Sequence, residues 1–336
     1  MIIKFSKGAS TKEVNKLCDI ISSNKISPFK VELSGIKYLI LSEEVDEELR
    51  NLVASSSFVS QTIDVVGPAN LTDRLLRPEG TEIEVGKHKI GRGAFTVIAG
   101  PCSIESEKQL LDIAQFLASH KTDILRAGAY KPRTSPYTFQ GIGEVGLEIL
   151  SSVSRETGLP VVTELMDVRD AELVARYTDI IQIGARNCQN YSLLKEVGKI
   201  GKPILLKRGA GCSIKELLLS AEYIMLNGND KIILCERGIK TFENNSRNTL
   251  DIAAVPVLKK ESHLPVIVDP SHATGDRSLV PALALAAMAA GADGLMVEVH
   301  YSPEAALSDG AQTLNYEEYR ALNIRLRILE EALNKG

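Results

Sequence analysis

The sequence contains no tryptophan, and aromatic residues make up only 5% of its 336 positions. It also lacks an excess of either charge, since 39 lysines and arginines stand against 43 aspartates and glutamates. A net charge of −4 marks no basic surface of the kind that binds nucleic acid or an anionic membrane. Hydrophobic residues reach 44% and charged residues 24%, a balance typical of folded globular proteins. Any cluster of cations must therefore be local.

Cysteines are few and scattered. Their odd number and the absence of a C-x-x-C pair argue against a disulfide framework or a structural zinc knuckle, and they favour a reducing cytoplasm. The five positions are Cys18, Cys102, Cys188, Cys212 and Cys235, of which we assign the last three to packing.

Long apolar runs are missing as well. Lysines at positions 4 and 7 interrupt the N-terminal apolar residues, so the sequence shows no apolar core of a secretory signal peptide there. The longest apolar stretch, residues 279–292, contains Pro281 and is shorter than the roughly 20 residues of a membrane span. We therefore expect no membrane partner, and we interpret this stretch as a buried Ala-rich helix.

The length and the order of predicted elements indicate two domains. Within residues 1–67 the pattern predicts strands at 2–5, 29–33, 38–41 and 62–66 and helices at 10–22 and 43–54. This β-α-β-β-α-β order is typical of a small ferredoxin-like domain. Residues 68–93 hold two prolines and four glycines around a hairpin signal at 84–87, and we take them as a linker with a lid on the second domain.

From residue 94 to 336 the pattern changes to short β-branched runs, each followed by a helix-length segment. The runs are 95–99, 123–126, 160–163, 179–183, 203–207, 231–235, 265–269 and 294–299. Eight near-continuous apolar strands separated by helices predict an α/β fold of the closed (β/α)₈, or TIM, barrel type. An open doubly wound sheet is the alternative, but the expected G-x-G-x-x-G turn is missing.

Charged and reactive residues gather just after the predicted strands, where such barrels carry their active sites. Seven of them are cations, and this density in an acidic protein predicts small polyanionic substrates, at least one of them a phosphate ester. They are Arg126, Lys131, Arg133, Arg186, Lys207, Arg208 and Arg237. Arg208 points to the other side of its strand from Lys207, so we expect it to be structural.

The same strand ends carry a thiol, an imidazole and carboxylates. Cys102, His272, Glu298 and Asp309 together suit a borderline divalent transition metal acting as a Lewis acid. His300 lies on the same strand face as Glu298, and spacing alone does not decide between it and His272 as a ligand.

The strand-end segments resemble 3-deoxy-D-arabino-heptulosonate 7-phosphate (DAHP) synthases, in particular the microbial subgroup with an N-terminal ferredoxin-like regulatory domain. The resemblance covers residues 80–336 and rests on sequence motifs in seven segments. They are Ala99-Gly100-Pro101-Cys102-Ser103, Lys131-Pro132-Arg133-Thr134-Ser135, Gln182-Ile183-Gly184-Ala185-Arg186-Asn187, Leu206-Lys207-Arg208-Gly209, Cys235-Glu236-Arg237-Gly238, Asp269-Pro270-Ser271-His272 and Glu298-Val299-His300.

The resemblance implies a metal-dependent, aldol-like condensation of phosphoenolpyruvate with D-erythrose 4-phosphate and water, which releases phosphate and opens the shikimate pathway to aromatic amino acids. It implies Mn²⁺ first, with Fe²⁺, Zn²⁺ and Co²⁺ as alternatives, held by Cys102, His272, Glu298 and Asp309. It places phosphoenolpyruvate on Arg126, Lys131, Ala185, Arg186, Lys207 and Arg237, and the sugar phosphate on Pro132, Arg133 and Thr134. Lys131 is the expected proton donor, Glu164 the residue that orients water, and His272 a further catalytic residue.

Three other interpretations stay open. A 3-deoxy-D-manno-octulosonate 8-phosphate synthase would share the barrel, but that family carries an Asn-Arg-Ser-like sequence where this chain has residues 131–134. A Schiff-base aldolase would use Lys131 or Lys207 as nucleophile and leave the metal donors unexplained. A non-catalytic effector-binding barrel would leave all the reactive groups unexplained.

The small domain carries no motif of its own. The resemblance implies feedback inhibition by an aromatic amino acid through this domain, and a homotetramer. A domain that only supports oligomer assembly is an equal alternative.

Overall fold

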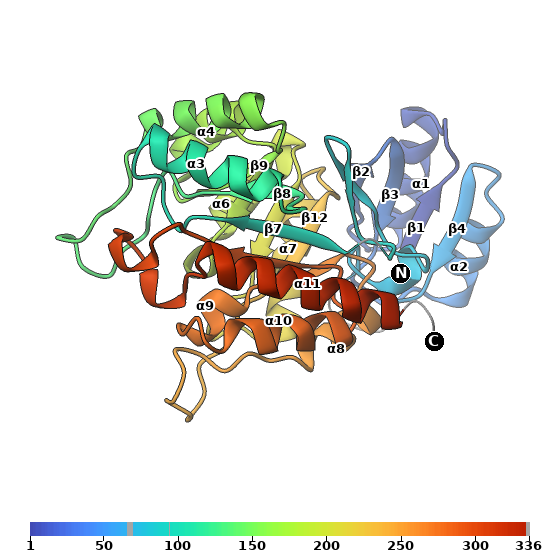
Figure 1. The fold of residues 1–336 in the computed structure, drawn as a ribbon. Helices are drawn as coiled ribbons and strands as arrows, with labels where there is room; N and C mark the ends of the chain where they lie inside the picture. Colours follow the sequence, from blue (N-terminus) through green and yellow to red (C-terminus); the bar gives the residue numbers. More distant parts are fainter. Residues whose placement is uncertain (66–69, 94, 334–336) are drawn as a thin grey trace.

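The computed structural model describes residues 1–65, 70–93 and 95–333. Its larger part is a closed barrel of parallel strands running from β7 to β14 (Figure 1). The strands are β7 Thr96–Gly100, β8 Ile124–Arg126, β9 Val161–Leu165, β10 Ile180–Ile183, β11 Ile204–Lys207, β12 Ile232–Glu236, β13 Val266–Val268 and β14 Gly294–Glu298. All eight fall within two residues of the predicted runs, so the predicted barrel is confirmed.

Helices surround the barrel and follow its strands in sequence. They are α3 Glu107–Ala118, α4 Glu144–Thr157, α5 Ala171–Tyr177, α6 Tyr191–Ile200, α7 Ile214–Met225, α8 Ala254–Glu261, α9 Pro270–Thr274, α10 Val280–Ala289 and α11 Tyr316–Leu333. Local chemistry sets their ends: Ser213 and Glu216 form a capping box at the start of α7, and Gly158 ends α4 in a left-handed conformation with φ 72°.

The apolar stretch 279–292 does form a helix, α10, but only part of it is buried. Its buried residues are Val280, Ala284, Ala287 and Met288, whereas Leu279 at its start is exposed. The helix thus covers the outside of the barrel with one face, as a helix of this fold must. Among the residues that the structure describes, no helix combines the length and the apolar character needed to cross a membrane.

The N-terminal residues form a four-stranded antiparallel sheet in the order β2-β3-β1-β4. Its strands are β1 Ile2–Phe5, β2 Phe29–Leu33, β3 Ile36–Ile40 and β4 Val59–Ile63, with helices α1 Thr11–Ser23 and α2 Glu47–Ala54 between them. The β2–β3 hairpin turns at Ser34 and Gly35, which have φ of 49° and 75°, as a two-residue turn of the I′ type requires. The predicted order of elements is therefore present.

Two predicted boundaries in this part were wrong. The helix predicted from residue 43 begins at Glu47, because the Asp46 side chain accepts a hydrogen bond from the Leu49 N–H and so caps the helix there. The strand predicted at 62–66 is β4, which lies three residues earlier and pairs with β1. Residue 66 of that prediction lies outside the described residues.

A short hairpin closes one end of the barrel. Strands β5 Ile83–Val85 and β6 His88–Ile90 pair in antiparallel fashion, at the place where the hairpin was predicted. Their side chains Ile83, Val85 and Ile90 join one apolar cluster with inward-facing barrel residues such as Ile98 and Ile233. The barrel interior is thus a packed core, sealed at the N-terminal ends of its strands.

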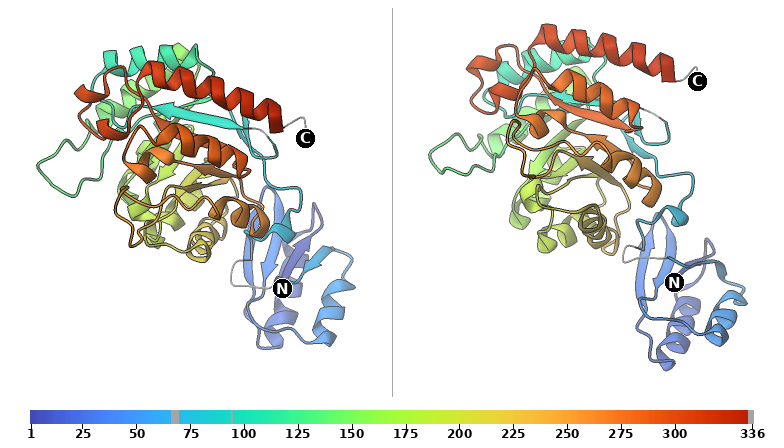
Figure 2. Two further views of the ribbon diagram at one scale, coloured as in Figure 1. Left: turned by 60° about the horizontal axis from the view of Figure 1, so that its bottom comes forward. Right: turned by 90° about the horizontal axis from the view of Figure 1, so that it is seen from below.

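The chain before this hairpin is fastened to the same end of the barrel. The buried Glu222 carboxylate, at the end of α7, accepts hydrogen bonds from the N–H and hydroxyl of Thr72. Asp230, just before β12, pairs with Arg77 and accepts a hydrogen bond from the Ser34 hydroxyl. The small domain therefore sits at the N-terminal ends of the barrel strands, whereas the loop after β8 projects from the opposite end (Figure 2).

Candidate active site

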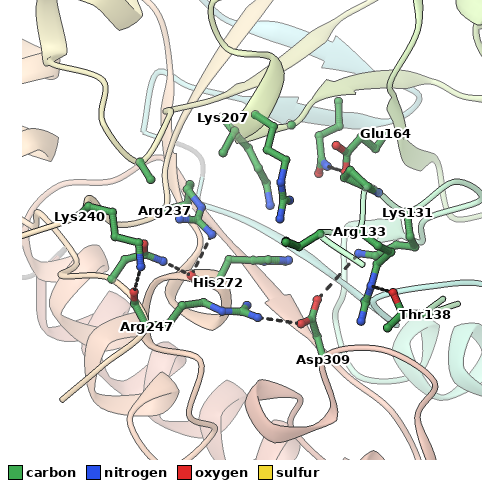
Figure 3. Close-up of a pocket in the computed structure, with 18 of the residues that line it drawn as sticks. Lys131, Arg133, Thr138, Glu164, Lys207, Arg237, Lys240, Arg247, His272 and Asp309 are labelled. Carbon is green, nitrogen blue, oxygen red and sulfur yellow. Dashed lines mark hydrogen bonds and ion pairs between the residues drawn. The ribbon is translucent and has the colours of Figure 1, made fainter. Parts of the chain in front are cut away.

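The C-terminal ends of the barrel strands surround a cavity of about 750 Å³ (Figure 3). Eleven of the predicted site residues line it, so the expected convergence of the strand ends is confirmed. They are Lys131, Pro132, Arg133, Thr134, Glu164, Ala185, Arg186, Lys207, Arg237, His272 and Asp309. The other three, Cys102, Arg126 and Glu298, are buried next to this set and do not line the cavity.

The predicted metal donors do come together. One ligand atom from each of Cys102, His272, Glu298 and Asp309 lies within 4.8 Å of the other three. A thiol, an imidazole and two carboxylates form a mixed donor set that suits borderline divalent metals rather than Mg²⁺ or Ca²⁺ alone. The residues present therefore fit a transition-metal ion.

Burial and neighbouring charges set the protonation of this cluster. Burial, and then the charge of Glu298, raise the pKa of the Cys102 thiol to about 12, so the free site holds a thiol. Its Sγ donates a hydrogen bond to Asp309 Oδ2 at 3.0 Å and accepts one from Lys131 Nζ at 2.8 Å. A bound cation would replace the thiol proton, as metal binding by cysteine generally requires.

Asp269 orients the histidine of the cluster. The His272 Nδ1 lies 2.7 Å from Asp269 Oδ2, and the carboxylate can only accept, so Nδ1 carries the proton. His272 Nε2 is thereby free to face the cluster, 3.3 Å from Glu298 Oε1. Burial alone would raise the pKa of Asp269, but the charges of His272 and Lys207 outweigh it and hold this pKa well below the usual value.

His300 does not belong to the donor cluster. Its ring is buried against Tyr301, and its Nδ1 accepts a hydrogen bond from the Ser302 N–H at 3.0 Å. Between the two histidines that the sequence left open, the structure brings His272 to the other donors.

The cationic side of the cavity is built by β8, β10, β11 and β12. Lys131 is buried, and although burial would lower its pKa, the neighbouring Cys102 sulfur and the negative charge of Glu298 raise it, so the side chain stays cationic. Lys207 pairs with the buried Asp269 at 2.5 Å. Arg237 donates to the His272 carbonyl at 3.1 Å, and Arg186 lies within the 3₁₀ turn Ala185–Asn187 after β10.

Glu164 is held at the cavity wall by close backbone packing. The Gln182 amide donates to Glu164 Oε2 at 3.2 Å. A Cβ atom at position 184 would lie 2.0 Å from Glu164 Oε1, so a larger residue there would displace this carboxylate from its present position. The absence of a side chain at Gly184, in the motif before Arg186, therefore allows the close contact with Glu164.

Arg208 has the structural role that the sequence predicted. Its guanidinium is buried and pairs with Glu236 and with Asp251, each at 2.8 Å. It points away from the cavity lining, which includes its neighbour Lys207.

Sequence reasoning missed several residues of the cavity. Lys240, Arg247 and Asn248 line it from the long segment between β12 and α8, and Gln182 lines it from β10. The unusual length of the segment 237–253 could have indicated that it reaches the cavity. Its cations were not predicted because they lie several residues after the strand end. Gln312, which contacts Glu298, gave no signal, because it lies in a loop with no motif.

Comparison with known proteins agrees with this geometry. The DAHP synthetase I family matches residues 74–335. A phospho-2-dehydro-3-deoxyheptonate aldolase of Thermotoga maritima is 48% identical over 99% of this chain and 98% of its own length. A crystal structure of the DAHP synthase from Thermotoga maritima covers 99% of this chain and 97% of its own with a TM-score of 0.79 and 46% identity.

A relative of the rival family is also similar, but less so. A 2-dehydro-3-deoxyphosphooctonate aldolase of Syntrophobacter fumaroxidans is 36% identical over 72% of this chain and 89% of its own length. The family match and the near-complete Thermotoga maritima relative decide between the two. The chain therefore belongs to the DAHP synthetase I family and is an enzyme of the DAHP synthase class.

Proposed function

We propose that the enzyme condenses phosphoenolpyruvate with D-erythrose 4-phosphate and water at a divalent metal, giving 3-deoxy-D-arabino-heptulosonate 7-phosphate and phosphate as the first step of the shikimate pathway. The observation that carries this proposal is one cavity with two kinds of chemistry. Its wall is lined with cations, and beside it four metal-ligating atoms lie within 4.8 Å of one another. Two anionic substrates need the cations in order to bind, and the aldehyde of the sugar needs the metal in order to become more electrophilic.

Phosphoenolpyruvate is assigned to the inner cations. Lys131, Arg186, Lys207 and Arg237, with the backbone at Ala185, line the cavity and offer the forked and point-like donors that carboxylate and phosphate groups bind. Arg126, the fifth cation of this assignment, is buried next to them, and its Nη1 pairs with Glu298 Oε1 at 2.5 Å. Lys131 and Lys207 are both nearly buried, so their charges act at a low effective dielectric. This burial favours a substrate of high charge in a small volume.

Erythrose 4-phosphate is assigned to the outer loop after β8. Pro132, Arg133 and Thr134 line the cavity there and are more exposed than the buried Lys131. Arg133 Nε donates to the Thr138 hydroxyl at 3.1 Å, which holds its guanidinium over the cavity mouth. A sugar phosphate held in this way would direct its aldehyde toward the metal donors.

The metal, Mn²⁺ first among the candidates, would be held by Cys102, His272, Glu298 and Asp309 and would act as a Lewis acid on the aldehyde of the sugar. Lys131 is the proton donor in this proposal. Its Nζ lies 2.8 Å from Cys102 Sγ and 4.0 Å from Asp309 Oδ2, so it faces the donor cluster and the cavity together. Glu164, which also lines the cavity, orients the water that adds to C2 of the enol ester.

The Schiff-base alternative is less favourable on electrostatic grounds. A nucleophilic lysine needs a lowered pKa, whereas the pKa of Lys131 is raised by the charges around it. Lys207 is paired with the buried Asp269, so its Nζ is engaged in an ion pair and is not free to attack a carbonyl. Both lysines are therefore better suited to bind anions.

The division into a small domain at 1–67, a linker with a hairpin at 68–93 and a barrel at 94–336 belongs to the same proposal. We also propose that an aromatic amino acid binds the small domain and inhibits the enzyme, and that the protein forms a homotetramer. All five cysteines are free and buried, which supports the cytoplasm as the compartment.

The test is phosphate release from phosphoenolpyruvate by Mn²⁺-loaded protein with each of two sugars. Turnover with erythrose 4-phosphate and none with arabinose 5-phosphate supports the proposal. Turnover with arabinose 5-phosphate alone would assign the octulosonate reaction instead. Borohydride in the presence of substrate checks the remaining alternative, because a trapped lysine adduct would establish a Schiff base.

A further inference from the structure

A buried glutamine touches one of the metal donors from outside the cluster. Gln312 is 1% exposed and lies in the short turn η5 Gly310–Gln312, in the segment between β14 and α11. Its Nε2 donates a hydrogen bond to Glu298 Oε2 at 2.6 Å. Glu298 Oε1 is the oxygen that faces His272 Nε2, at 3.3 Å. Gln312 thus holds the oxygen of Glu298 that does not face the other donors.

An arginine completes the arrangement. Arg247 Nη1 donates to Gln312 Oε1 at 2.7 Å, and its Nη2 lies 3.1 Å from Asp309 Oδ1 (Figure 3 shows the contact with Asp309). Asp309 Oδ2 faces the opposite way, toward Cys102 Sγ. One guanidinium fork therefore joins the outer oxygen of Asp309 to the amide that holds the outer oxygen of Glu298.

The orientation of the glutamine amide follows from its partners. A guanidinium can only donate, so the atom of Gln312 that faces it must be the carbonyl oxygen. The amide nitrogen is then directed at Glu298, a carboxylate that only accepts. A side-chain amide donates on one side and accepts on the other, and it adds no charge to the cluster.

The backbone around this relay is fixed at both ends. The Arg247 N–H donates to the Thr274 carbonyl at 2.9 Å, two residues beyond His272 in helix α9. Asp309 adopts a left-handed conformation with φ 53°, which a residue with a side chain keeps only when its surroundings hold it. The Thr313 hydroxyl and the Gln312 N–H both donate to the Asp309 carbonyl.

From this geometry we propose that Gln312 and Arg247 are positioning residues of the metal centre. They hold Glu298 and Asp309 with one oxygen of each carboxylate directed into the donor cluster, so that the cluster is arranged before the metal arrives. Neither residue is one of the four donors; Gln312 lies outside the cavity lining, and Arg247 is part of it. The inference rests on the proposed function, in that it requires the four donors to bind a metal.

The test measures metal binding rather than turnover. Gln312→Met keeps the length of the side chain and removes both hydrogen bonds, and Arg247→Met removes the fork. Arg277→Met is the matched control, because Arg277 is a half-exposed arginine at the same end of the barrel that pairs with Glu304 and Glu318 instead. Chelator-stripped proteins are titrated with Co²⁺, and the dissociation constant and the visible absorption spectrum are recorded.

Loss of an outer hydrogen-bond partner of a metal ligand typically weakens metal affinity 10- to 100-fold. We expect a weakening of about this size and an altered Co²⁺ spectrum in both variants, and an unchanged constant and spectrum in Arg277→Met. Because the two residues act as one relay, we expect the double variant to bind Co²⁺ about as weakly as the weaker single variant.

A fold-only role would lower the melting temperature of the metal-free protein and leave Co²⁺ binding unchanged, and this result would overturn the inference. If Gln312→Met does not fold, the half-exposed Arg247 carries the test alone, with the same two readouts. Failure of the wild-type protein to bind Co²⁺ would refute the proposed metal site itself, and the inference with it.

Discussion

His272 Nδ1 donates a hydrogen bond to Asp269 Oδ2 across 2.7 Å, and this bond fixes which ring nitrogen faces the donor cluster. Metal-binding histidines are commonly oriented by a carboxylate in this way. Asp269 also pairs with Lys207, so one buried carboxylate serves both the metal side and the anion side of the site.

Replacing Asp269 by Asn should therefore weaken metal binding about 10- to 100-fold, because the histidine loses its charged partner. The measurement is Mn²⁺ or Co²⁺ affinity of the chelator-stripped protein. Asp293→Asn is the matched control, since Asp293 is a buried carboxylate paired with Lys259 just before β14, at the other end of the barrel. Equal metal affinity in Asp269→Asn and the wild type would contradict the orienting role.

Lys131→Met should reduce turnover at least 100-fold, within the range in which positioned acids and bases contribute to catalysis. The change removes the ammonium that faces Cys102 and Asp309 while keeping an unbranched apolar side chain. Phosphate release at saturating substrates is the measurement. Near-normal turnover would refute the role of Lys131 as proton donor.

Substitutions of two arginines on neighbouring strand ends should have different effects, one on substrate binding and the other on stability. Arg186→Gln should raise KM for phosphoenolpyruvate about tenfold or more, because charge-assisted hydrogen bonds are worth roughly 1.5–3 kcal/mol, and should leave the melting temperature unchanged. Arg208→Met leaves the buried Glu236 without its partner and should destabilise the fold by about 3–5 kcal/mol. A higher KM without loss of stability in Arg208→Met would contradict its structural assignment.

Glu222 should make stability depend on pH. Burial raises the pKa of this carboxyl to about 7 in the folded protein, against an ordinary value of 4.5. Above pH 4.5 the unfolded chain loses the proton that the folded chain keeps, so the free energy of unfolding falls as the pH rises toward 7. Glu222→Gln keeps the acceptor for Thr72 and has no charge to bury.

We therefore expect Glu222→Gln to gain stability over the wild type between pH 5 and pH 8, by on the order of 2–3 kcal/mol. Denaturant unfolding of both proteins at the two pH values is the measurement. A stability difference that is the same at both pH values would show that Glu222 does not titrate in this range.

Much of the fold was predictable because buried parallel strands leave a strong apolar signal. The placement of Cys102 and His272 at the same mouth was predictable because each comes soon after a strand end, but the choice of His272 over His300 required the structure. The register of β4 was not, because its exposed residues Ser60 and Gln61 carry no apolar alternation. The start of α2 was not predicted correctly either, because it is set by a single cap at Asp46. The charged residues before this cap fit the helical pattern but lie outside the helix.

The residues that orient the candidate metal donors were harder to predict than the donors themselves. Asp269 stands in a recognised motif, but its shared contact with Lys207 and His272 depends on the closure of β11 and β13 into one barrel. Arg247 and Gln312 lie in loops 65 positions apart in the sequence and meet only at the cluster. Such contacts have no period or spacing that a single sequence could reveal.

Metal dependence is tested most directly by phosphate release from phosphoenolpyruvate and erythrose 4-phosphate by chelator-stripped protein, before and after Mn²⁺ is restored. We expect no turnover without metal and restored turnover with it, and no restoration in Cys102→Ala. Full turnover by the stripped wild-type protein, with metal content verified as absent, would contradict the central claim that a metal held by Cys102, His272, Glu298 and Asp309 drives the condensation.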